Sequence, residues 1–147
     1  MLIESVEAMR DLGAKLASQL RPGDIIVLRG NLGAGKTAFT QGIGRQLGIS
    51  DVTSPTFVIS RTHKAKIPLI HVDAYRLLGS ATQGFEIDDL DLQTARENAI
   101  TVIEWGEEVA TRLHEDFLLV DITFGESENE RIVEFVGKGE RWESFQL

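Results

Sequence analysis

The chain has 147 residues, no cysteine, and 23 Asp and Glu residues against 15 Lys and Arg residues, which gives a formal net charge of −8. The length fits one domain, residues 1–147, and the lack of cysteine excludes disulfides, thiolate metal sites and a cysteine nucleophile. An acidic surface repels phosphate backbones, so tight nucleic-acid binding by the chain alone is not expected. An acidic beginning and the lack of a long apolar run predict a cytoplasmic protein without a membrane segment. The oligomeric state stays open.

The first third of the chain predicts a helix, a buried strand and a second helix. Apolar residues spaced three and four apart over residues 6–20 predict an amphipathic helix that stops at Arg21-Pro22-Gly23. The apolar run at residues 25–28 is typical of a buried parallel strand. Residues 38–47 carry apolar side chains four apart and predict a helix. Turn-forming residues over 48–56 then predict a loop.

The rest of the chain is rich in predicted strands. The expected elements are strands at 57–61 and 67–72, a loop over 79–91, a strand at 99–104, a short helix at 107–113, and strands at 117–124 and 131–136 around a turn at 125–129. Pro68 places its strand near an edge of the sheet or marks that strand's beginning. The fold class is therefore α/β, with a mostly parallel central sheet, antiparallel additions and flanking helices.

Residues 30–37 read Gly-Asn-Leu-Gly-Ala-Gly-Lys-Thr and match the phosphate-binding loop Gly-x-x-x-x-Gly-Lys-Ser/Thr between a strand and a helix. Glycines without a Cβ allow backbone conformations closed to other residues, so the loop can bring its N–H groups around phosphate oxygens. Lys36 supplies a positive charge for the β- and γ-phosphates, and Thr37 supplies a hydroxyl for Mg²⁺. The sequence thus predicts a P-loop NTPase that binds nucleotide through residues 31–37: Asn31, Leu32, Gly33, Ala34, Gly35, Lys36 and Thr37.

Acidic residues at two predicted strand ends are candidates for the second half of such a site. Period-two alternation puts His71, Asp73 and Tyr75 on one side of a strand, at the carboxyl end where open α/β sheets bind ligands. Glu104 ends another apolar run, the position of a Walker B acid. Either acid could hold Mg²⁺, and each could instead cap a neighbouring element. A transition-metal site at His71 and Asp73 lacks a third ligand nearby, so Mg²⁺ is preferred.

Four motifs in order give the chain a resemblance to a known family. They are residues 30–37, then Ser54-Pro55-Thr56-Phe57, then His71-Val72-Asp73-Ala74-Tyr75-Arg76-Leu77, then Ile103-Glu104-Trp105. Together they resemble the TsaE family, small bacterial P-loop ATPases of the machinery that makes threonylcarbamoyladenosine in tRNA. The resemblance spans roughly residues 5–136 and is far more specific than any single motif. Two departures stand out: Asn31, where the family usually has an acid, and residues 79–84, where a Glu-rich helical stretch is usual.

The resemblance implies ATP and Mg²⁺ as cofactors, weak hydrolysis by the chain alone, and docking onto a TsaB–TsaD pair that transfers the threonylcarbamoyl group. The ATPase would reset or regulate that transferase. The catalytic residues would be Lys36, Asp73, Glu104 and Thr56. Thr37 and Glu104 would hold Mg²⁺, Asp73 would support the metal or orient water, and Thr56 would lie in a switch-like loop that senses the γ-phosphate. Trp105 and Glu107 would lie near the nucleotide or the partner.

Three other functions share the phosphate loop. A small nucleoside or nucleotide kinase needs an acceptor pocket and commonly an arginine-rich lid, and the arginines after the loop are scattered. A GTP-dependent switch needs an Asn-Lys-x-Asp-like guanine reader, which the sequence lacks. A nucleotide-binding interaction module without turnover has the same sequence signature as an ATPase, so it remains an alternative.

Overall fold

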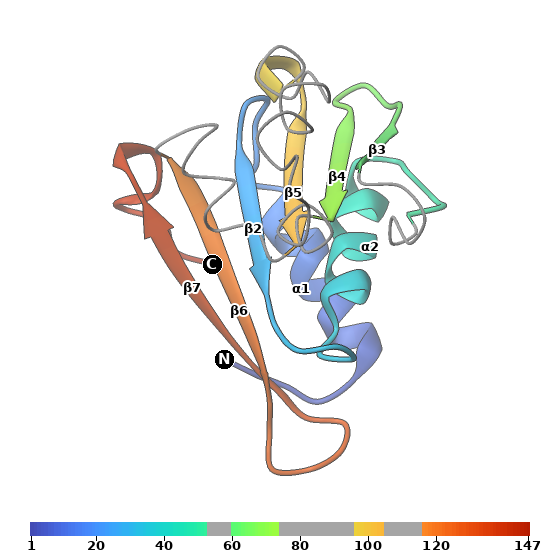
Figure 1. Cartoon of the computed structure of the whole chain (residues 1–147), viewed down its shortest axis with the longest axis vertical. Coiled ribbons are helices and arrows are strands. Elements are labelled where there is room, and N and C mark those ends of the chain that lie inside the picture. Colours follow the sequence, from blue (N-terminus) through green and yellow to red (C-terminus); the bar gives the residue numbers. More distant parts are fainter. Residues whose placement is uncertain (53–59, 74–95, 105–115) are drawn as a thin grey trace, which may run out of the picture.

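The computed structural model describes residues 1–52, 60–73, 96–104 and 116–147, and these form one mixed sheet with two helices on the same face (Figure 1). The strand order is β1-β7-β6-β2-β5-β4-β3. The strands are β1 (Leu2–Ile3), β2 (Ile25–Arg29), β3 (Ser60–His63), β4 (Leu69–Asp73), β5 (Ile100–Glu104), β6 (Phe117–Phe124) and β7 (Arg131–Lys138). The helices are α1 (Val6–Ala17) and α2 (Lys36–Gln46), with single 3₁₀ turns at Arg96–Asn98 and Glu140–Trp142.

The centre of the sheet is parallel and its margins are antiparallel, as the sequence predicts. β2 pairs in parallel with both β5 and β6, and β4 pairs in parallel with β5. β3, β7 and β1 add antiparallel strands at the two sides. The α/β class and the mostly parallel centre are therefore confirmed. Pro68 precedes β4, which lies between β5 and β3, so it marks the beginning of an inner strand.

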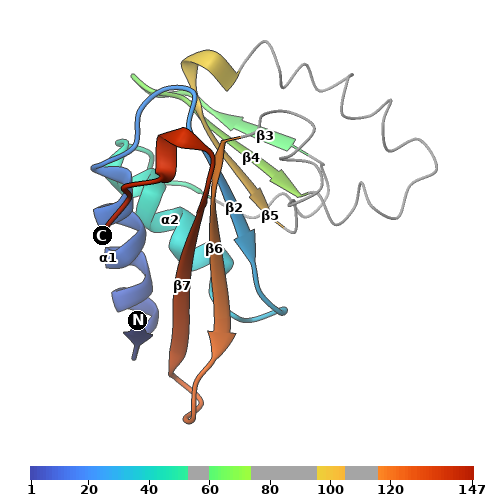
Figure 2. The same ribbon diagram turned by 90° about the vertical axis from the view of Figure 1, so that its left-hand side faces the viewer.

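The two helices bury their apolar sides against one face of the sheet (Figure 2). Ser5 caps α1 by accepting a hydrogen bond from the Ala8 backbone N–H at 3.0 Å. Phe39 and Ile43 of α2 are fully buried there. On the opposite face, a second apolar layer is equally buried and contains Ile25, Val27, Ile70, Val72 and Ile103. Burial on both faces explains why the central strands are continuous apolar runs.

Two glycines let the backbones of α1 and α2 touch. A Cβ on Gly42 of α2 would collide with the backbone of Arg10, and a Cβ on Gly13 of α1 would collide with the carbonyl oxygen of Phe39. Arg10 also donates from Nε to the Gln41 side-chain oxygen at 3.1 Å. The helix that follows the phosphate loop is thus fixed against α1 without an intervening side chain.

Several details differ from the sequence prediction. The first helix ends at Ala17, so Leu20 lies beyond it, and Val6 is 60% exposed while Leu12 joins the buried side. A stripe of residues 9, 12, 13 and 16 fits the 3.6-residue period better than the predicted stripe. β3 begins at Ser60 in the described part of the chain and continues to His63, two residues beyond the predicted end at Arg61. β1 and the turn at Glu140–Trp142 were not predicted, because short elements give little periodic signal.

Other predicted elements fall outside the described residues. These are residues 57–59 of the first hairpin strand, the loop at 79–91 and the helix at 107–113. The turn at 125–129 is confirmed, since the Gly125 N–H donates to the Glu130 carbonyl at 2.9 Å. Among the described residues, no helix has the length and apolar character needed to cross a membrane. The cytoplasmic location stays a prediction.

The Gly42 contact gives a direct test of the helix packing. Ala is the better helix former by about 1 kcal/mol, so helix propensity alone would make Gly42→Ala stabilising. We expect Gly42→Ala to lower the free energy of unfolding by about 1–3 kcal/mol, because its Cβ forces α1 and α2 apart. Urea unfolding followed by circular dichroism measures the change. The control is Gln46→Ala at an exposed position of α2; a Gly42→Ala protein as stable as this control would contradict the close contact.

Candidate functional site

The phosphate-loop sequence forms a tight connection between β2 and α2. The Ala34 N–H donates to the Asn31 carbonyl at 3.0 Å, which closes a turn inside the loop. Gly33 has φ +81° and Gly35 has φ +113°, conformations that side chains rarely adopt. Gly30 differs from the prediction, because its φ is not positive and its role is steric. A Cβ there would lie 2.7 Å from the Ile122 carbonyl oxygen of β6.

The loop presents one exposed side and one buried side. Asn31, Leu32 and Gly33 are exposed, and the Leu32 side chain is almost entirely in solvent. Ala34 is buried in the core and Lys36 is 8% exposed. The N-cap of α2 is Gly35, which has no side chain to cap the helix. The first N–H groups of α2 have no acceptor within the helix, so they and the positive end of the helix dipole suit an anion.

Lys36 lies beneath the loop with its ammonium against backbone oxygens. Its Nζ donates to the Gly30 carbonyl at 2.5 Å and contacts the Asn31 carbonyl at 3.3 Å. Burial is the main influence on this group and lowers the pKa of Lys36 below its usual 10.5, while the charges of Glu104 and Asp73 oppose that shift. Burying the ammonium costs free energy, which the two carboxylates partly offset. A buried positive charge also attracts an added anion more strongly than an exposed one does.

The parallel sheet brings the two predicted acids together beside this ammonium. Asp73 ends β4 and lies opposite Glu104, which ends β5, and Glu104 in turn lies opposite Leu28 of β2. Opposed residues of a parallel pair put their side chains on the same face. Glu104 is buried and Asp73 is half-buried. The phosphate loop and both acids therefore meet at the carboxyl edge of three adjacent strands, where α/β sheets bind ligands.

Glu104 has a buried partner that was not predicted. His71 is fully buried, and its Nε2 lies 3.2 Å from Oε1 of Glu104. The contact orients the carboxylate, because a hydrogen bond between buried groups is electrostatically stronger than one in water. A sequence signal was available: His71 precedes Asp73 by two residues on the same strand face, the side on which Glu104 lies. Sequence reasoning considered His71 as a metal ligand and missed it as the partner of an acid.

The remaining predicted site residues divide into two groups. Thr37 is the second residue of α2 and is half-buried at the end of the loop, next to Lys36. Thr56, Trp105 and Glu107 lie outside the described residues, as does Tyr75. Within residues 1–52, 60–73, 96–104 and 116–147, no three His, Asp or Glu side chains are close enough to hold a metal ion by themselves.

The chain is similar to proteins of one known family. A family model described as "Threonylcarbamoyl adenosine biosynthesis protein TsaE" matches residues 3–133. This chain belongs to the TsaE family. A Streptomyces coelicolor protein named tRNA threonylcarbamoyladenosine biosynthesis protein TsaE is 48% identical over 141 residues, which cover 91% of this chain and 93% of that protein. A Mycobacterium tuberculosis TsaE is 46% identical over 77% of this chain and 71% of its own length.

The fold agrees with the family. A crystal structure of Bacillus subtilis YdiB superimposes with a TM-score of 0.76 at 29% identity, covering 97% of this chain and 87% of the other. The resemblance seen in the four sequence motifs is therefore confirmed, and the chain belongs to a family of tRNA threonylcarbamoyladenosine biosynthesis proteins.

The buried ammonium of this TsaE-family chain predicts an unusual dependence of stability on pH. Because the pKa of Lys36 is lower in the folded chain than in the unfolded chain, the unfolded chain binds more protons at alkaline pH. The destabilising effect of Lys36 is thus complete below its folded pKa and fades as pH rises toward 10.5.

We expect Lys36→Met to be at least as stable as the wild type at pH 7, with an advantage that shrinks as pH approaches 10.5. Urea unfolding at pH 7, 9 and 10 measures this, with the exposed Lys15→Met of α1 as the control. A Lys36→Met protein less stable than the wild type at all three pH values would show that the carbonyl hydrogen bonds outweigh the cost of burial.

Proposed function

We propose that this chain is a Mg²⁺-dependent ATPase that regulates threonylcarbamoyladenosine formation in tRNA by acting on a TsaB–TsaD transferase pair. The observation that carries the proposal is the convergence of Lys36, Asp73 and Glu104 at one edge of the sheet. Family membership supplies the biological context. The chain would bind ATP and use its hydrolysis to change the state of the transferase, without transferring the threonylcarbamoyl group itself.

The residues of the phosphate loop and of the two strand ends fit Mg²⁺ and a nucleoside triphosphate. The loop combines two glycines at positive φ with a buried ammonium and an uncapped helix N-terminus, all suited to phosphate oxygens. Thr37, Asp73 and Glu104 offer one hydroxyl and two carboxylates, the hard oxygen ligands that Mg²⁺ prefers. The bound metal would supply positive charge that neutralises the phosphates during transfer to water.

Each residue of this chain then has a defined task. Lys36 and the N-terminus of α2 hold the phosphates and stabilise negative charge that moves toward the leaving oxygen. His71 holds the Glu104 carboxylate in a single orientation. Asp73 lies nearer the solvent than Glu104 and either supports the metal or orients the attacking water. Hydrolysis by the chain alone is expected to be weak, with the transferase pair increasing it.

The first test separates phosphate binding from every other role. We expect the wild type to bind ATP with Mg²⁺, to hydrolyse it faster when TsaB and TsaD are added, and to copurify with that pair when ATP is present. Lys36→Met should weaken ATP binding on the order of a hundredfold, because it removes a buried charge at the phosphates. Isothermal titration calorimetry and phosphate release are the measurements, with Lys15→Met as the matched control. Unchanged hydrolysis in Lys36→Met would disprove the loop assignment, and phosphate transfer to an added nucleoside would identify a kinase instead.

The second test concerns the acid at the end of β5. Glu104→Gln is nearly isosteric, and its side-chain oxygen can still accept a hydrogen bond from His71. We expect the variant to keep its fold and to lose Mg²⁺-dependent ATP hydrolysis by on the order of a hundredfold. Hydrolysis is measured over a series of Mg²⁺ concentrations, alongside Glu134→Gln at an exposed position of β7 as the matched control. Full activity in Glu104→Gln would assign the metal to Asp73.

A further inference from the structure

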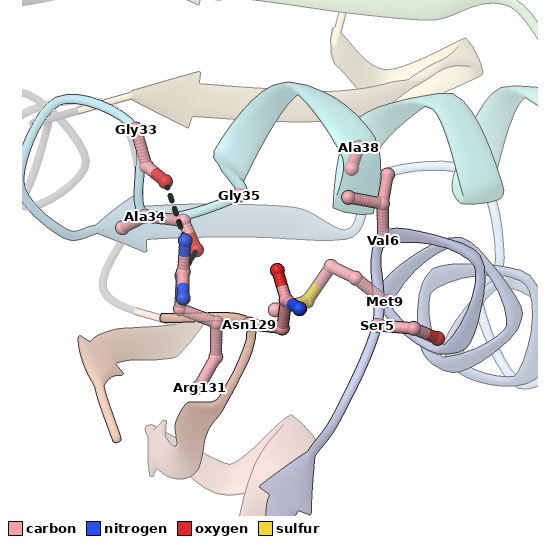
Figure 3. A pocket seen from close by; sticks show the side chains of 9 residues that line it. All are labelled: Ser5, Val6, Met9, Gly33, Ala34, Gly35, Ala38, Asn129 and Arg131. Atoms are coloured by element: carbon pink, nitrogen blue, oxygen red, sulfur yellow. Dashed lines mark hydrogen bonds between the residues drawn. The ribbon is translucent and has the colours of Figure 1, made fainter. Parts of the chain in front are cut away.

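Arg131, the first residue of β7, joins the phosphate loop to the opposite end of the sequence. Its Nη2 donates to the Gly33 carbonyl at 3.2 Å, the dashed line in Figure 3. Its Nε donates to the Ala34 carbonyl at 3.1 Å. Both acceptors lie between the glycines that carry positive φ angles. The guanidinium therefore binds two adjacent peptide groups between these glycines.

The guanidinium is itself held in place by other groups. Its Nη1 donates to the carbonyl oxygens of Glu128 at 2.7 Å and Glu130 at 2.8 Å, in the turn before β7. The same group lies over the Phe124 ring, 4.6 Å from the ring centroid. Phe124 and Arg131 are opposed in the antiparallel ladder of β6 and β7. These contacts restrict the guanidinium, so binding the loop costs little further side-chain conformational entropy.

Binding these two carbonyls determines where the loop N–H groups point. In a trans peptide group the C=O and the N–H lie on opposite sides. With the Gly33 carbonyl held by Arg131, the Ala34 N–H points the other way and donates to Asn31. With the Ala34 carbonyl held by Arg131, the Gly35 N–H likewise points away from the guanidinium. Glycine peptides rotate easily, so an unbraced loop would sample other orientations.

We propose that Arg131 is a positioning residue for the phosphate loop: it fixes the peptide groups after Gly33 and Ala34 so that the loop is ready to bind phosphate. It acts on backbone carbonyls from behind the loop, beside a cavity of about 80 Å³ that Asn129, Met9 and Ser5 also line. The role rests on the proposed nucleotide binding, but the bracing of the loop is a property of the protein without nucleotide.

Two variants separate geometry from charge. Arg131→Met removes the side-chain hydrogen bonds of Arg131 and keeps an apolar side chain. Arg131→Lys keeps the positive charge but cannot present a planar fork to two carbonyls. The control is Arg141→Met, which removes another two-pronged arginine contact, the one to Asp24 at the opposite end of β2. Thermal unfolding by circular dichroism selects conditions under which each variant is folded.

The first measurement is hydrogen exchange in the peptide spanning residues 30–37, without nucleotide. We expect exchange there to be faster by on the order of tenfold in Arg131→Met and in Arg131→Lys, and unchanged in Arg141→Met at matched stability. Loop exchange equal to that of the wild type in both Arg131 variants would overturn the proposal, whether or not the chain binds ATP. This result is therefore independent of the Lys36→Met test of the proposed function.

The second measurement is ATP affinity by calorimetry. We expect both Arg131 variants to bind ATP on the order of tenfold more weakly, while Arg141→Met binds like the wild type. Wild-type affinity in Arg131→Lys would show that charge alone matters and would overturn the positioning role. Should the wild type bind no ATP, the proposed function fails, and the exchange result alone decides whether Arg131 orders the loop.

Discussion

The site depends on one constraint, the parallel register of β2, β5 and β4. Parallel strands end at the same edge, so the loop after β2 comes to lie beside the residues that end β5 and β4. Asp73 and Glu104 are opposed in the ladder, and both act electrostatically on Lys36. A slip of one residue in either pairing would turn an acid to the other face of the sheet. The apolar layers on both faces hold that register.

Lys36 is a charged group that the fold keeps buried at the proposed phosphate site. Desolvation disfavours its charge, while two carbonyl oxygens and two carboxylates favour it. The balance leaves an ammonium with little access to water, and such a group interacts far more strongly with phosphate than an exposed lysine does. The carboxylates nearby oppose the effect of burial on its pKa. Under the proposed function, phosphate affinity and stability are therefore opposed at this one side chain.

The sequence predicted most of the framework and less of the site's inner contacts. Apolar runs and helical spacing located the central strands and α2 because burial on both faces leaves a strong pattern. Lys36, Asp73 and Glu104 could be assigned to one sheet edge from strand ends alone. The partnership of His71 with Glu104 was missed: strand alternation puts His71 on the face of Asp73, but the contact itself depends on strand pairing across 33 residues. The contacts of Arg131, 97 residues from Ala34, left no signal in the sequence. The sequence predicted a glycine requirement at Gly30 from backbone conformation. The actual requirement is steric, because the Ile122 carbonyl of a distant strand leaves no room for a Cβ.

The contact between Arg131 and Ala34 also bears on the order in which the chain assembles. The loop precedes its brace by 97 residues, and β6 lies between β7 and the central strand β2. During synthesis, the loop therefore leaves the ribosome long before the residue that orders it. Local elements such as α2 can form early, whereas a contact of this sequence separation forms late. We therefore expect a chain that ends before Arg131 to carry the phosphate-loop sequence without the two hydrogen bonds that brace it.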